Sequence, residues 1–213
     1  MTARTPARAR NSARRPSAGA LAAAAQISAR RTRRRNYKLA ASAGVLAVLA
    51  VLVTVGLLTS RPTSSNARRL APGFSLPTTA GTTVTLGDYR GRSVVLYFNE
   101  GAGCGSCTMQ LSAIEKQQKA FDDAGIVVLP IVMNTKEQIQ PDLDQYQVKT
   151  PVLLDDGKVS RAYNTLGKGM HEGLPGHSFV LIDAQGNQRW FGEYPSMWLE
   201  PSKLLAEISA RLA

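Results

Sequence analysis

The stretch VVLYFNEGAGCGSC, residues 94–107, determines the fold expected for this chain. Residues 94–98 are apolar, β-branched or aromatic, which predicts a short buried strand. The glycines and polar residues that follow break this pattern, and both cysteines of the protein come next, at Cys104 and Cys107. From Cys107 onward, apolar residues recur at helical spacing, at Leu111, Ile114 and Phe121. The stretch therefore predicts a strand, a tight loop and a helix, with the cysteine pair at the junction of loop and helix.

This position favours a reactive thiol at Cys104. The unpaired backbone N–H groups and the dipole at a helix N-terminus favour negative charge, and the thiolate is the reactive form of cysteine. Cys107 falls on the apolar stripe of the helix, so we expect it to face inward. One exposed thiol with a shielded partner suits thiol–disulfide exchange, because the second thiol resolves the mixed disulfide. The alternative is a static disulfide or two inert cysteines, but a bridge over two intervening residues would constrain the unfolded chain very little.

Other segments carry a family resemblance. The segment APGFSLP at 71–77, followed by GTTVTL at 81–86 and Arg90-Gly91, resembles the start of the redoxin branch of the thioredoxin superfamily. That branch includes the alkyl hydroperoxide reductase and thiol-specific antioxidant (peroxiredoxin-like) proteins and the membrane-tethered thiol–disulfide oxidoreductases, whose redox motif is similar to the Cys104–Cys107 pair. With SFVLID at 178–183, the resemblance covers residues 71–213. It implies an α/β thioredoxin-like sandwich around a central mixed sheet.

The glycine-rich loop before residue 178 is a second candidate part of the site. In the thioredoxin-like fold, this loop faces the cysteine pair and carries a cis-proline six residues before the Asp that ends the strand. Here that position holds His177, and Pro175 lies two residues earlier. His177 could stabilise the Cys104 thiolate or shuttle its proton, since histidine titrates near neutral pH. The alternative is a loop histidine that bonds to backbone, and we expect His171 to lie at the surface.

The cysteine segment itself departs from the thioredoxin pattern. The aromatic residue that precedes the first cysteine in thioredoxins is replaced by Gly103, and Gly105 and Ser106 separate the cysteines. The buried acidic residue of thioredoxins is also missing, because Tyr97 stands in that strand. Glu100 is the nearby carboxylate, either as a proton acceptor for Cys107 or as a solvated loop residue.

The peroxiredoxin pattern P-x-x-x-T-x-x-C is absent as well. Counted back from Cys104, its threonine position holds Gly101. This departure argues against peroxide reduction by the cysteine pair.

Charge divides the chain into four parts. The formal charge is +11, yet residues 1–38 hold eleven Arg or Lys and no acidic residue, so all the excess lies in this arm, which we expect to be disordered and cytoplasmic. Residues 39–58 carry no charge and predict a single-pass transmembrane signal anchor, although a cleaved signal is the alternative. Residues 59–70 form a polar linker to the 71–213 domain, which would lie outside a bacterial-type cell membrane. The basic arm adjoins the membrane segment, so we expect it to contact lipid rather than nucleic acid.

The rest of the domain follows a regular pattern. Residues 136–147 predict a helix interrupted at Pro141, and residues 184–187 predict a turn. Strands are expected at 126–132, 151–155, 178–183 and 188–193, and further helices at 158–166 and 201–212. Alternation of strands and helices, followed by a hairpin and a helix, is typical of an α/β sandwich.

Three functions fit these observations. The first is a membrane-tethered thiol–disulfide oxidoreductase that needs no cofactor and acts on protein thiols or disulfides or on a redox partner. The second is a peroxiredoxin-like peroxidase in which Cys104 becomes a sulfenic acid and condenses with Cys107. The third is a module for copper(I) or zinc that uses the two cysteines with His171 and His177.

Overall fold

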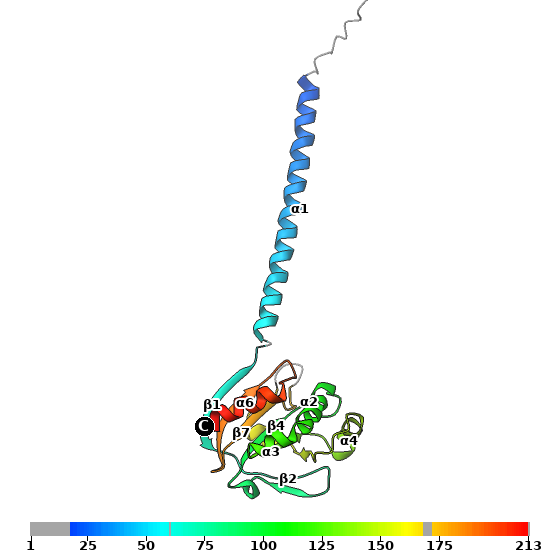
Figure 1. The fold of residues 1–213 in the computed structure, drawn as a ribbon. Coiled ribbons are helices and arrows are strands. Elements are labelled where there is room, and N and C mark those ends of the chain that lie inside the picture. Colours follow the sequence, from blue (N-terminus) through cyan, green and yellow to red (C-terminus); the bar gives the residue numbers. More distant parts are fainter. Residues whose placement is uncertain (1–17, 60, 168–171, 213) are drawn as a thin grey trace, which may run out of the picture. The chain divides into compact units, whose positions relative to one another are not determined.

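The computed structural model describes residues 18–59, 61–167 and 172–212. The chain divides into two units, residues 1–56 and 57–213. The first unit consists mainly of one long helix, α1 (Ala18–Thr59), shown in blue in Figure 1. Within the described residues, Asn36–Leu58 is a helical segment long and apolar enough to cross a membrane.

The basic arm differs in part from the expected disorder. Residues 18–38 are helical, whereas residues 1–17 lie outside the described part of the chain. The physical reason is composition, because residues 18–29 are rich in alanine, which has the highest helix propensity, and they extend a helix that the apolar segment already forms.

A mixed sheet forms the centre of the second unit. Its strand order is β1-β8-β7-β4-β5-β6. The strands are β1 (Thr63–Leu70), β4 (Ser93–Phe98), β5 (Ile126–Val132), β6 (Leu153–Leu154), β7 (Ser178–Ile182) and β8 (Asn187–Glu193). Strands β4, β5 and β6 are parallel to one another. Strand β7 pairs with β4, β8 with β7 and β1 with β8, each in antiparallel orientation. This topology confirms the predicted thioredoxin-like sandwich with a mixed sheet.

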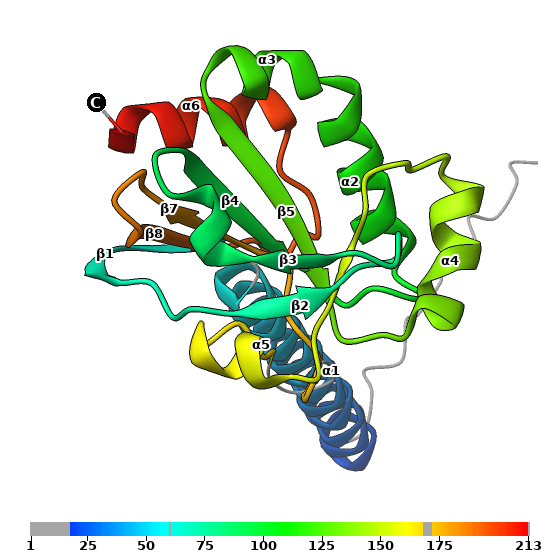
Figure 2. The same ribbon diagram turned by 90° about the horizontal axis from the view of Figure 1, so that it is seen from below.

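Both faces of the sheet are covered (Figure 2). Helices α2 (Gly105–Lys116), α3 (Gln118–Asp123) and α6 (Pro201–Leu212) lie on one face. The other face carries α5 (Lys158–Ala162) and the small sheet of β2 (Ser75–Pro77) and β3 (Thr83–Thr85), which leads into the 3₁₀ turn η1 (Leu86–Tyr89). Strand β4 serves both cores, because Val95 and Tyr97 pack on the α2 side while Leu96 and Phe98 pack on the opposite side.

Two predicted boundaries need correction. The linker expected over residues 59–70 is shorter, because Thr63–Leu70 forms strand β1, which satisfies the open backbone groups of β8. Helix α4 (Lys136–Gln145) is not interrupted at Pro141. A capping box between Thr135 and Gln138 starts this helix, and a proline within it removes a single intrahelical hydrogen bond.

Candidate functional site

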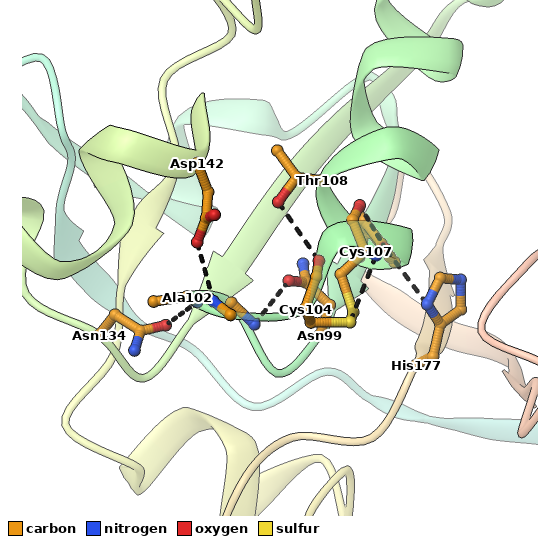
Figure 3. The surroundings of a disulfide bond; sticks show 11 residues. Asn99, Ala102, Cys104, Cys107, Thr108, Asn134, Asp142 and His177 are labelled. Atoms are coloured by element: carbon orange, nitrogen blue, oxygen red, sulfur yellow. Dashed lines mark hydrogen bonds between the residues drawn. A yellow bond between two sulfur atoms is a disulfide. The ribbon is translucent and has the colours of Figure 1, made fainter. Parts of the chain in front are cut away.

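Cys104 and Cys107 form a disulfide at the start of α2 (Figure 3). Cys104 is the N-cap residue of the helix, and its Sγ accepts the backbone N–H of Cys107 at 3.3 Å. Cys104 is half-buried, whereas Cys107 is fully buried among core residues. The expected geometry of one accessible and one shielded sulfur is therefore present, and in the reduced pair the same N–H would stabilise a Cys104 thiolate.

Side-chain oxygens hold the loop ahead of Cys104. The backbone N–H of Gly101 donates to Asn99 Oδ1 at 3.0 Å, that of Ala102 to Asn134 Oδ1 at 3.0 Å, and that of Gly103 to Asp142 Oδ2 at 2.8 Å (Figure 3). Asn99 directly follows β4, Asn134 follows β5, and Asp142 belongs to α4. One local and two tertiary contacts therefore hold the loop that presents the first cysteine.

Two glycines of the cysteine segment, Gly101 and Gly105, lie where a side chain would meet a neighbouring residue. Gly101 has a φ of +77°, which side chains rarely adopt, and a Cβ there would collide with the Asn134 side chain. A Cβ on Gly105, between the two cysteines, would lie 2.6 Å from Tyr146 Oη. Ser106 is exposed and leaves the other position between the cysteines open to solvent.

His177 immediately precedes β7 and is 2% exposed. Its Nδ1 lies 3.3 Å from the hydroxyl of Tyr97, which donates to the backbone carbonyl of Cys107 at 3.1 Å. Burial lowers the pKa of His177 to about 4, so the imidazole is neutral at pH 7. The structure thus brings the predicted histidine to the cysteine pair, where Tyr97 lies between the two.

Pro175 is buried two residues before His177. No peptide bond among the described residues is cis, so the Leu174–Pro175 bond is trans and His177 occupies the position before the strand. His171 lies outside the described residues.

A cavity of about 390 Å³ adjoins the histidine. Glu100 and His177 contribute to its wall. The other lining residues come from the start of β1, from the segment before β7, from β8 and from the segment after β8. The negative charge of Glu100 adds to burial in raising the pKa of Tyr97 well above its usual value. Glu100 therefore lies close to the Tyr97–His177 contact.

The sequence interpretation missed three supporting residues. The sequence pattern marks Tyr97 only as the replacement of an acidic residue, and it gives no role to Asn134 or Asp142. Asn134 follows β5, and the carboxyl ends of parallel strands such as β4 and β5 meet at the same sheet edge, which was an available signal. The described residues contain no cluster of three or more His, Cys, Asp or Glu side chains arranged to hold a metal ion.

Comparison with known proteins finds relatives that are named peroxiredoxins. A putative peroxiredoxin of Mycobacterium tuberculosis is 34% identical over 99 residues, which cover 46% of this chain and 63% of that protein. The chain thus spans less than two thirds of the length of this relative. Peroxiredoxin Bcp of Escherichia coli is 30% identical over 123 residues, which cover 55% of this chain and 78% of that protein.

Solved structures agree with the fold. Peroxidoxin BcpB from Mycobacterium tuberculosis has a TM-score of 0.58 at 19% identity, covering 68% of this chain and 97% of that chain. A putative protein disulfide isomerase from Bacteroides thetaiotaomicron has a TM-score of 0.53 at 25% identity, covering 70% of this chain and 94% of that chain. The AhpC/TSA family matches residues 67–191, which include the cysteine pair, His177 and most of the sheet. The chain therefore belongs to the AhpC/TSA family, a peroxiredoxin-like group of redox proteins with a thioredoxin-like fold.

Proposed function

We propose that this protein is a thiol–disulfide oxidoreductase that uses Cys104 and Cys107 as a dithiol–disulfide pair. The observation that carries the proposal is the disulfide across the first turn of α2, between a half-buried Cys104 and a fully buried Cys107. A partner thiolate would attack Cys104, form a mixed disulfide with it and release Cys107. In the reverse direction, Cys107 would attack the mixed disulfide, release the partner and restore the Cys104–Cys107 bond. Protein thiols and disulfides, or a dedicated redox partner, are the expected substrates.

The surroundings of the cysteines support exchange over peroxide reduction. Gly101 replaces the peroxiredoxin threonine counted from Cys104, and its φ of +77° would strain a β-branched residue. Counted from Cys107, the proline and threonine positions of that motif hold Glu100 and Cys104. Neither cysteine therefore has the hydroxyl that the motif would supply.

The family and its relatives favour a second candidate, a thiol peroxidase. The M. tuberculosis and E. coli relatives are both named peroxiredoxins, while the similar structure from Bacteroides is named a putative protein disulfide isomerase. In a peroxidase reaction, Cys104 would be oxidised by the hydroperoxide to a sulfenic acid, and Cys107 would condense with it to give the same disulfide with loss of water.

One experiment separates the two candidates. The reduced full-length chain in detergent is mixed with hydrogen peroxide or with a small protein disulfide, and loss of free thiols is followed in both. We expect faster oxidation by the protein disulfide, loss of that reaction in Cys104→Ser, and a trapped mixed disulfide in Cys107→Ser. Preferential oxidation by peroxide, with a sulfenic acid accumulating in Cys107→Ser, would instead establish the peroxidase.

We also propose that α1 tethers the redox domain to the outer face of a cell membrane. Asn36–Leu58 contains 23 residues, which span about 34 Å as a helix, enough for a hydrocarbon core. The basic residues that precede it favour a cytoplasmic N-terminus. Membrane fractionation and the intact mass of the mature protein test this proposal, because a cleaved signal would release a domain lacking these residues.

A further inference from the structure

The hydroxyl of Tyr97 joins the two halves of the site. Tyr97 belongs to β4 and is fully buried, and its ring stacks on Phe179 of β7 at a centroid distance of 4.8 Å. The hydroxyl contacts the carbonyl of Cys107 in the first turn of α2 and Nδ1 of His177 ahead of β7. A ring packed in this way has little freedom, so the hydroxyl holds the histidine close to the cysteine helix.

Proton counting determines the form of the histidine. A phenol has one O–H, and the Cys107 carbonyl can only accept, so the tyrosine proton points to that carbonyl. The tyrosine oxygen is then the acceptor, and His177 Nδ1 must carry the proton of the contact between them. The reverse arrangement would place the tyrosine and carbonyl oxygens 3.1 Å apart with no proton between them.

The second ring nitrogen is consequently a buried hydrogen-bond acceptor. A neutral imidazole has one N–H, so Nε2 keeps its lone pair. It is buried and has no hydrogen-bond partner among the described residues, and in Figure 3 it is the ring nitrogen farther from Cys107. An unsatisfied buried acceptor is energetically unfavourable, so its presence at a redox site points to a functional use.

We propose that Tyr97 is the positioning residue of this redox site, which fixes His177 as the Nδ1-protonated form and leaves Nε2 as an unprotonated hydrogen-bond acceptor. The proposal rests on the redox role of the cysteine pair and applies to either candidate substrate, since both require the disulfide to be reduced again. An entering thiolate bonds through its sulfur to Cys104 Sγ. The Cys104–Cys107 bond then breaks, and Cys107 leaves as a thiolate.

The first test is the tautomer itself. The full-length chain carrying His171→Gln has His177 as its only histidine, and ¹⁵N NMR of the histidine ring distinguishes a protonated from an unprotonated nitrogen. We expect protonated Nδ1 and unprotonated Nε2 at pH 7, and a shift toward Nε2 protonation in Tyr97→Phe. Protonated Nε2 in the parent chain, or an unchanged tautomer in Tyr97→Phe, would overturn the proposal.

The second test is the rate at which dithiothreitol reduces the Cys104–Cys107 disulfide. We expect Tyr97→Phe and His177→Gln each to slow this reaction severalfold, because both remove the contact that holds the histidine against the cysteine helix. The double variant should be no slower than His177→Gln, because Tyr97 acts through the histidine. Independent, multiplying effects would contradict the proposal.

Tyr163→Phe is a matched control. Tyr163 is also a buried tyrosine whose hydroxyl donates to a backbone carbonyl, that of Pro72 at 2.7 Å, in the core on the opposite face of the sheet. It should leave both the tautomer and the reduction rate unchanged, and a change equal to that of Tyr97→Phe would indicate a general loss of stability. These readouts need no physiological substrate, so their failure is distinguishable from failure of the exchange reaction.

Discussion

The cysteine segment and the histidine segment meet at one site but are held there in different ways. Three consecutive backbone N–H groups before Cys104 each donate to a side-chain oxygen from a different part of the domain. His177, by contrast, has one side-chain hydrogen bond in the described structure, from Nδ1 to Tyr97, and its other ring nitrogen has none.

This difference indicates separate roles. The first sulfur is held by a preorganised loop, so single changes around it should act mainly on stability. The histidine depends on one contact and on burial, so changes there should act on protonation. Three predictions, in order of decreasing effect on stability, test this contrast.

The largest effect is expected from Gly101→Thr, which would introduce the peroxiredoxin residue. The φ of +77° and the collision with the Asn134 side chain should together lower the free energy of unfolding by about 3 kcal/mol or more. Gly81→Thr is the control, because Gly81 has a φ of +78° but open space around its Cβ position. Chemical denaturation should show a clearly smaller loss for the control, and equal losses would mean that the loop adjusts freely.

The next effect concerns pH and His177. Burial lowers its pKa from 6.5 to about 4 in the folded protein, so between these values the unfolded chain binds a proton that the folded protein does not. The free energy of unfolding should therefore fall as the pH drops below about 6.5, by about 2 kcal/mol at pH 5.

Denaturation of His177→Gln at pH 7 and pH 5 checks this value. The variant lacks the titrating ring and should lose about 2 kcal/mol less than the parent over this range. Asp183 and Glu115, whose hydrogen bonds lower their pKa, are present in both proteins and cancel in the comparison. Parallel pH curves would show that the histidine is more solvated than its burial implies.

The smallest effect is expected from Asn134→Ala. It removes the acceptor of the Ala102 N–H and should cost about 1 kcal/mol, with faster hydrogen exchange at that amide. Asn134→Asp keeps an oxygen at the same place and should retain most of the protection. If Asn134→Ala leaves exchange at Ala102 unchanged, this hydrogen bond does not hold the loop.

Strand β1 is an element that side-chain periodicity does not predict. Its segment TSSNARRL is polar and has no apolar alternation, which by itself predicts part of a linker. It nevertheless pairs with β8, and Arg69 Nε donates to Gln188 Oε1 at 2.9 Å. A polar edge strand is recognised by the backbone groups it satisfies, which a periodicity of side chains does not record.

Local sequence alone predicts the strand–loop–helix unit, the buried strands and the inward position of Cys107. Each of these follows from local periodicity and from the chemistry of a helix N-terminus, which act over a few residues. The Tyr97–His177 contact, the oxygens of Asn134 and Asp142 at the loop, and the need for glycine at residue 101 depend on the tertiary structure. They join residues 32 to 80 positions apart, which the pairing of β4 with β5 and β7 and the packing of α4 near α2 bring together.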